Sequence, residues 1–239
     1  MSTGKIETRR GGNGAVSQLG ADAMAERDCR ASEQPPLWRT GRKKCFLAKE
    51  VIYRESDTVD RAGLIRSGLV KLLSYLPNGR ARIVRLHASG DWLGLEGLMG
   101  ETYEHTAMAV DDVEVRYASI RSVQRLVHDN PSQMEYLLQQ WHGNLAQADR
   151  WISDFSTGEI QPRVARLLEF LAELEYGQAS DRVELLTVCE MAEMLGVTQE
   201  SVSRILATFK RGDILHKESD SLREIYRLDA PRLRQEARK

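Results

Sequence analysis

The fold of this chain is decided by residues 187–206, which read TVCEMAEMLGVTQESVSRIL. Thr187 and Glu190 have the S/T-x-x-E spacing of a capping box, in which each residue satisfies a backbone donor of the other. This spacing predicts a short helix over 188–195. Gly196 follows at once, and glycine is the residue best suited to the left-handed position that ends a helix.

A second helix is predicted directly after this turn. Thr198 can cap it, and residues 199–211 continue at helical spacing. Its predicted buried face consists of Val202, Ile205, Leu206 and Phe209. Two helices that cross closely need a small residue where they touch, and Ala192 occupies that place. Together the two segments predict a helix-turn-helix.

Short strands are predicted around this motif, over 183–185, 214–215 and 225–228. The last two are joined through residues 218–221 and have the pattern of a wing. Residues 159–239 are therefore predicted to form a winged helix-turn-helix domain that binds DNA.

In such a domain the start of the second helix enters the major groove, where base edges carry a unique pattern of donors and acceptors. The candidates for base contact are Gln199, Glu200, Ser203 and Arg204. An arginine can donate two hydrogen bonds to guanine, and a glutamate can accept one from cytosine or hold the arginine in place. The candidates for phosphate contact are Thr198, Ser201, Lys210 and Arg211. A solvated helix face remains the alternative, most of all for the last two.

Residues 37–130 are predicted to form a β-rich sensor-type domain. Short alternating apolar runs occur at Val51–Tyr53, Leu69–Leu73, Ile83–Leu86 and Val113–Tyr117. The sequence Pro77-Asn78-Gly79 supplies the fixed and positive φ angles of a tight hairpin. This spacing of strands is typical of a jelly roll, so the whole chain is predicted to be α+β.

Helical periodicity begins after Ser119, first to about His128 and then in a long helix over 131–158. That helix carries a seam with a period of 3.5 residues, formed by Met134, Leu138, Trp141, Leu145, Ala148, Ile152 and Phe155. The seam predicts pairing with the same helix of a second copy, giving a two-fold homodimer. Packing of the stripe on its own domain is the alternative. A further helix is predicted from Pro162 to near Gly177.

The composition of the chain limits the classes of function that it can have. The chain has 239 residues, 34 basic and 35 acidic, and a net charge of −1, so affinity for DNA must come from a local basic surface. Residues 1–36 are polar and glycine-rich and are predicted to be a disordered tail. No apolar run is long enough to span a membrane, which favours a cytoplasmic protein. No motif of an enzyme is present. The three cysteines are too scattered for a zinc site or a disulfide framework, so no metal is expected.

The sequence resembles the Crp/Fnr family of bacterial transcription regulators from about Arg42 to Leu228. The resemblance is carried by Ser67-Gly68, by residues 89–94 and 98–100, by the long helix and, most specifically, by residues 187–206. It implies a double-stranded β-helix of the cyclic-nucleotide-binding type, a dimerisation helix, and a winged helix that recruits RNA polymerase from a two-fold symmetric site, with activation as the expected outcome.

Glu200, Ser203 and Arg204 match the E-x-x-S-R recognition pattern of the Fnr and FixK side of the family. The resemblance therefore implies TTGA and TCAA half-sites. It places the effector pocket at Leu95, Glu96, His105 and Thr106. Here the cyclic-AMP branch has an arginine and this chain has His105, so a nucleotide anion would meet no arginine and cyclic AMP is not expected.

An iron-sulfur cluster is not expected either, because the N-terminal half offers only Cys29 and Cys45, and no cofactor is predicted. Haem bound by His87 and His105, as in gas-sensing members, stays open. Cys189 beside the DNA is a candidate redox switch, with an inert residue as the alternative. A dimer that needs no ligand and an effector-binding signalling module that acts through protein contacts stay open as well.

Overall fold

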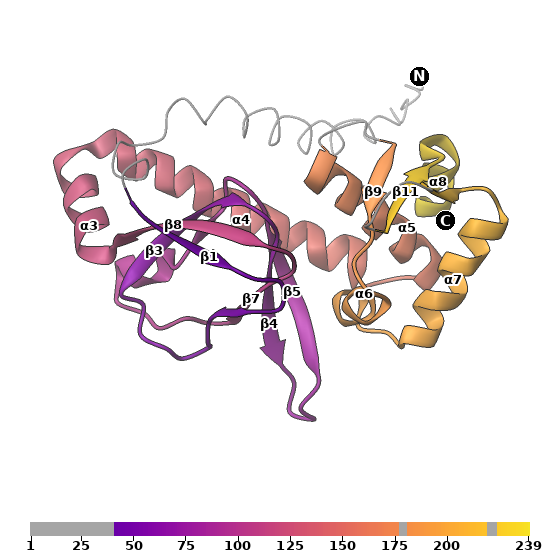
Figure 1. Ribbon diagram of the computed structural model, residues 1–239, viewed down its shortest axis with the longest axis horizontal. Helices are drawn as coiled ribbons and strands as arrows, with labels where there is room; N and C mark the ends of the chain where they lie inside the picture. The colour runs from indigo at the N-terminus through magenta and orange to yellow at the C-terminus, as the bar shows by residue number, and fades with distance from the viewer. Residues whose placement is uncertain (1–40, 177–180, 219–223) are drawn as a thin grey trace, which may run out of the picture. The chain divides into compact units, whose positions relative to one another are not determined.

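The computed structural model describes residues 41–176, 181–218 and 224–239, and it confirms the α+β class (Figure 1). The predicted disordered tail over 1–36, with Cys29, lies outside the described residues. All described residues belong to one compact unit.

The predicted jelly roll is present as two four-stranded antiparallel sheets. The first sheet has the order β1 (Arg42–Phe46), β8 (Val113–Ser119), β3 (Arg61–Ser67) and β6 (Trp92–Leu93). The second has the order β2 (Val51–Tyr53), β7 (Thr106–Ala109), β4 (Val70–Tyr75) and β5 (Ala81–His87).

Alternation along the strands separates two apolar cores. On β3, Ile65 joins a cluster with Phe46 and Val115, whereas its neighbour Leu64 joins a cluster with Trp92. Successive side chains of a strand point to opposite faces, so β3 contributes to both cores. The helices α3 (Ile120–Asp129) and α4 (Pro131–Phe155) contribute Val123 and Leu137 to the core that holds Leu64.

The β4–β5 hairpin has the turn that the sequence predicts. Tyr75 pairs with Ala81, Gly79 has a φ of 77°, and the amide of Gly79 donates to the carbonyl of Leu76 at 2.8 Å. A register shift between Leu72 and Leu73 marks an irregularity in the pairing of the hairpin.

The two long helices start and stop close to the predicted residues. Helix α4 begins at Pro131 as predicted but ends at Phe155, before residue 158. Helix α5 (Ile160–Tyr176) begins two residues earlier than the predicted Pro162. Proline is tolerated there because the first turn of a helix leaves its N–H groups without intrahelical partners.

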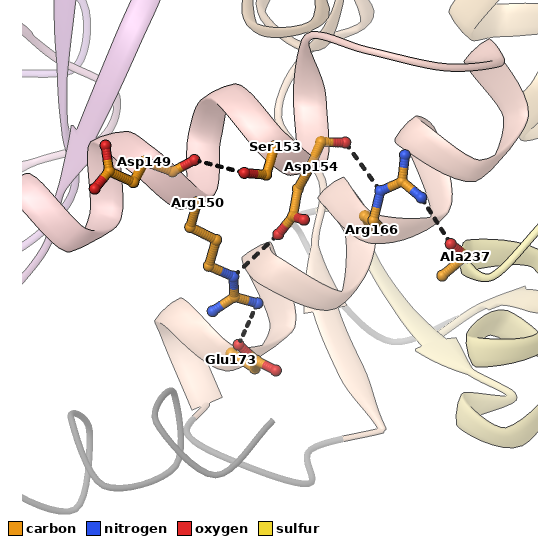
Figure 2. A network of polar contacts seen from close by, with 7 residues as sticks. All are labelled: Asp149, Arg150, Ser153, Asp154, Arg166, Glu173 and Ala237. Carbon is orange, nitrogen blue, oxygen red and sulfur yellow. Dashed lines mark hydrogen bonds and ion pairs between the residues drawn. The ribbon is translucent and has the colours of Figure 1, made fainter. Parts of the chain in front are cut away.

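The junction between α4 and α5 buries one residue of the predicted dimer seam. Phe155 is 1% exposed and makes edge-on ring contacts with Trp151 and Phe170 of the same chain. Its assignment to a dimer interface is therefore wrong, because α5 packs back onto the last turn of α4 and covers it. Figure 2 shows the polar contacts around this junction, where Arg150 lies 3.2 Å from Asp154 and 3.1 Å from Glu173.

The winged helix follows. It contains α6 (Val188–Leu195), α7 (Gln199–Arg211), α8 (Ala230–Ala237) and a sheet in the order β10 (Leu215–Lys217), β11 (Ile225–Leu228) and β9 (Arg182–Glu184). Its core is continuous with the β4–β5 hairpin, since Leu73 and Ile83 belong to the same buried cluster as Met191. The two predicted domains therefore share apolar contacts in this structure.

We expect Gly68→Ala to destabilise the roll more than Gly79→Ala does. Both glycines have positive φ angles, which cost an alanine about 1–2 kcal/mol. At Gly68 an added Cβ would also lie 2.5 Å from the carbonyl oxygen of Asp112, whereas nothing lies within 4 Å at Gly79. Overpacking adds roughly 1–3 kcal/mol. Urea unfolding at one protein concentration measures both variants, and equal losses would contradict this explanation.

Candidate nucleic-acid interface

The first helix of the motif is fixed by the predicted capping box. The amide of Glu190 donates to Thr187 Oγ1 at 3.2 Å, and the amide of Thr187 donates to Glu190 Oε2 at 3.0 Å. The helix ends at Gly196, which has a φ of 64° and is left-handed as predicted. Local sequence therefore determines where α6 starts and stops.

The second helix presents one face to the core and another to the surroundings. Val202, Leu206 and Phe209 are buried, and Ile205 is only half-buried although the sequence predicts it in the core. The four candidates for base contact all lie on the exposed side of the first two turns: Gln199, Glu200, Ser203 and Arg204. Their exposure leaves these side chains free to reach a groove of DNA.

Arg204 and Glu200 differ in how they are held. Within the part of the chain that the structure describes, no side-chain hydrogen bond or ion pair engages the Arg204 guanidinium, so its donor fork is available. Hydrogen bonds from its own backbone N–H and from the Thr198 side chain lower the pKa of Glu200. Glu200 is therefore a charged acceptor at neutral pH, which suits contact with a base-edge donor.

The four candidates for phosphate contact fall into two groups. Thr198 caps α7, and its Oγ1 lies 3.1 Å from Ser201 Oγ at the helix start. Lys210 and Arg211 lie in the last turn. Lys210 Nζ donates to the hydroxyl of Tyr226 at 2.9 Å, so the lysine also supports the wing strand β11.

The apolar seam of α4 is exposed along most of its length. The exposed fractions are 45% for Met134, 59% for Leu138, 38% for Trp141, 59% for Leu145 and 62% for Ile152. Ala148 is half-buried, and only Phe155 is covered by its own chain. An exposed row of large apolar side chains of this size is unusual for a surface that stays in water.

The predicted effector residues lie near the short 3₁₀ helix η1 (Leu95–Met99) and on β7. Leu95 and Thr106 are buried, and Glu96 and His105 are half-buried. Burial raises the pKa of Glu96 and lowers the pKa of His105.

One arginine from another strand acts on this cluster through its charge. Arg85 of β5 is close enough for its charge to lower the pKa of both Glu96 and His105. Its Nε is buried without a hydrogen-bond partner among the described residues. Sequence reasoning missed Arg85 because it lies 20 residues before His105 on a different strand, and only the folding of the sheet brings the two together.

Cys189 is exposed on α6, and its Sγ lies 3.6 Å from Glu193. Partial desolvation of the sulfur, followed by the neighbouring carboxylates of Glu193 and Glu190, raises the pKa of this thiol. The candidate haem ligand His87 is 3% exposed, with Nδ1 3.6 Å from Asp91. Residues 41–176, 181–218 and 224–239 hold no group of three or more His, Cys, Asp or Glu side chains placed for a metal ion. Over the same ranges, no helix combines the length and hydrophobicity that crossing a membrane requires.

Comparison with known proteins agrees with this architecture. Residues 43–130 match the family model of the cyclic nucleotide-binding domain, and residues 163–236 match that of the Crp-like helix-turn-helix domain. Among solved structures, FixK2 from Bradyrhizobium japonicum has a TM-score of 0.72 at 24% identity, covering 82% of this chain and 97% of its own. A CRP-family transcriptional regulator from Thermus thermophilus has a TM-score of 0.69 at 27% identity, with the same coverage.

Two characterised relatives show the same relationship in sequence. The nitrogen fixation regulation protein FixK from Bradyrhizobium diazoefficiens is 26% identical over 184 residues, which is 76% of this chain and 77% of FixK. The transcriptional regulator LdrP from Thermus thermophilus is 30% identical over 200 residues, which is 81% of this chain and 96% of LdrP. These relatives are regulators, not enzymes, and the exposed recognition helix fits that role. The chain belongs to the Crp/Fnr family of DNA-binding transcription regulators.

Proposed function

We propose that this regulator binds DNA as a homodimer at a palindromic site with TTGA and TCAA half-sites and activates transcription by contacting RNA polymerase. The observation that carries the proposal is that the chain has two exposed surfaces of different character: the polar start of α7 and the apolar seam of α4. A DNA target also implies that the protein works in the cytoplasm.

The seam supports a two-fold dimer. Its side chains recur at intervals of four and three residues from Met134 to Ile152, the spacing at which two helices interlock. A second copy of α4 offers the same row, so one self-complementary contact would cover both. A two-fold dimer presents two recognition helices in inverted orientation, which predicts inverted half-sites.

The half-site sequence rests on Glu200, Ser203 and Arg204, the pattern shared with the Fnr and FixK side of the family. FixK is itself a relative. Activation is proposed on the same footing: a relative from Rhizobium leguminosarum, 25% identical over 181 residues, is named a probable transcriptional activator. Contact with RNA polymerase is the direct way for a bound dimer to activate.

An effector would meet Leu95, Glu96, His105 and Thr106. The charge of Arg85 acts on this cluster too. No cofactor is part of the proposal. Haem bound by His87 and His105 is left out of it, because His87 is 3% exposed and its Nδ1 lies 3.6 Å from Asp91.

A signalling module that acts through protein contacts is the second candidate, and salt separates the two. Binding to DNA releases counterions, so the logarithm of affinity falls by about 0.9 per phosphate contact for each tenfold rise in salt. Affinity for a protein partner of this nearly neutral chain would change little over the same range.

We expect Leu138→Glu combined with Leu145→Glu to convert the dimer into a folded monomer that binds operator DNA weakly. Both side chains are 59% exposed, so the change costs the single chain little while it places charges inside the proposed interface. Light scattering and circular dichroism measure mass and folding. Met99→Glu, at an exposed apolar position outside the helix, is the control. A double variant that remains dimeric would refute the seam.

We expect Arg204→Ala to weaken operator binding by about 1–3 kcal/mol and to relax the preference for the guanine that it contacts. Fluorescence anisotropy on the operator and on duplexes with single base changes measures both effects. Arg125→Ala, an exposed arginine on α3, is the control. An equal loss on every duplex would show that Arg204 contacts phosphate and reads no base.

We expect brief peroxide treatment at pH 7 to leave operator binding unchanged in both the wild type and Cys189→Ser. The raised pKa keeps Cys189 as the unreactive thiol, and the thiolate is the form that is oxidised. Cys45→Ser controls for the other exposed thiol among the described residues. Loss of binding that Cys189→Ser alone prevents would instead make Cys189 a redox switch.

A further inference from the structure

Two arginines of the sensor roll lie beside the DNA-reading helix. Arg80, directly before β5, and Arg82, within β5, line a surface cavity of about 240 Å³ together with Gln199, the first residue of α7. Gly196, the glycine between the two helices of the motif, lines the same cavity. The hairpin and the recognition helix therefore border one surface.

The hairpin is fixed against the motif by a buried ion pair. Lys71 Nζ of β4 lies 2.8 Å from Glu190 Oε1, and the two side chains are 10% and 13% exposed. Glu190 is also the acidic residue of the α6 capping box. Leu73 and Ile83 of the hairpin pack in the same cluster as Met191 of α6. The two arginines thus lie on a hairpin that is packed against the helix-turn-helix.

Gly196 makes room for one of these arginines. The Arg82 guanidinium occupies the space that any side chain at Gly196 would fill. After burial, the charge of Arg82 is the next cause that lowers the pKa of Arg163, so positive charge gathers behind this surface.

Neither arginine is neutralised within the described residues. No hydrogen bond or ion pair engages the guanidinium of Arg80 or of Arg82 there. One carboxylate, that of Glu193, lines the cavity, and it accepts a weak hydrogen bond from Cys189 at 3.6 Å. Two arginines against one carboxylate leave an excess of positive charge next to the positive end of the α7 dipole.

We propose that Arg80 and Arg82 bind a phosphate of the DNA backbone beside the groove that α7 reads. This inference rests on the proposed function and extends it, because the contact comes from the sensor roll and not from the winged helix. An arginine suits such a contact since its planar fork donates two hydrogen bonds to phosphate oxygens. The footprint on DNA would then include both parts of the chain.

The test compares salt dependence. We expect Arg80→Gln combined with Arg82→Gln to make the slope of log affinity against log salt shallower by about one unit for each phosphate that the variant no longer binds. At about 0.1 M salt this is roughly an eightfold weaker affinity per phosphate, similar on operator and non-operator duplexes. The control, Arg121→Gln combined with Arg125→Gln, makes the same charge change at exposed positions on α3 and should leave the slope unchanged.

The outcomes separate the two levels of inference. If the wild type fails to bind the operator at low salt, the proposed function falls and this contact with it. If the wild type binds and the double variant keeps its slope, only the contact is refuted. Arg80→Gln alone decides the matter if the double variant misfolds, because Arg80 is exposed.

A free phosphate ion is the other ligand of this cavity that the experiments must distinguish from a phosphate of DNA. Thermal unfolding in sodium phosphate is compared with unfolding in sodium chloride at equal ionic strength. Stabilisation of the wild type that the double variant lacks, together with an unchanged slope on DNA, would assign the cavity to a small anion and overturn the DNA contact. A shallower slope without any stabilisation by phosphate supports it.

Discussion

The arrangement of the DNA-binding half depends on two arginines of α5 that donate hydrogen bonds to the C-terminal carbonyls of other helices. Arg163 Nε donates to the carbonyl of Phe155 at 2.8 Å, and its Nη2 donates to the carbonyl of Leu195. Arg166 Nε donates to the backbone carbonyl of Asp154 at 2.9 Å, and its Nη1 donates to the carbonyl of Ala237 at 2.7 Å, as Figure 2 shows. The last carbonyls of a helix have no partner within it and carry the negative end of the dipole. Each arginine therefore joins the end of α4 to the end of α6 or α8.

Because Arg163 is buried, losing its hydrogen bonds would be costly. Arg163 is 8% exposed, and burial, followed by the charges of Arg82 and Arg166, lowers its pKa. An unpaired buried cation is costly, so the helix ends must stay where they satisfy it. The orientation of α6 is thereby tied to the last turn of α4. Because a short turn joins α6 to α7, the orientation of α7 is tied to it as well. This coupling explains why the seam stops at Ile152: the next seam position, Phe155, is needed to pack α5.

The sequence correctly predicts the features that residues close together in the chain determine. Thr187, Glu190 and Gly196 specify the limits of α6 within ten residues, and the structure has those limits. The hairpin at residues 77–79 and the start of α4 at Pro131 are equally local. Interactions between distant residues were missed: Lys71 and Glu190 are 119 residues apart, and the charge of Arg85 on β5 acts on Glu96 and His105. Phe155 was misassigned for the same reason, because period alone does not show which helix covers a stripe.

The Lys71–Glu190 pair defines position more than it adds stability. Desolvating two charges offsets most of their attraction, so a buried pair often contributes little to the free energy of unfolding. Apolar contacts such as those of Leu73 and Ile83 with α6 are not directional and tolerate sliding. An ammonium and a carboxylate that are both buried are satisfied only in one register of the hairpin on the helix. The pair therefore determines where Arg80 and Arg82 stand relative to Gln199.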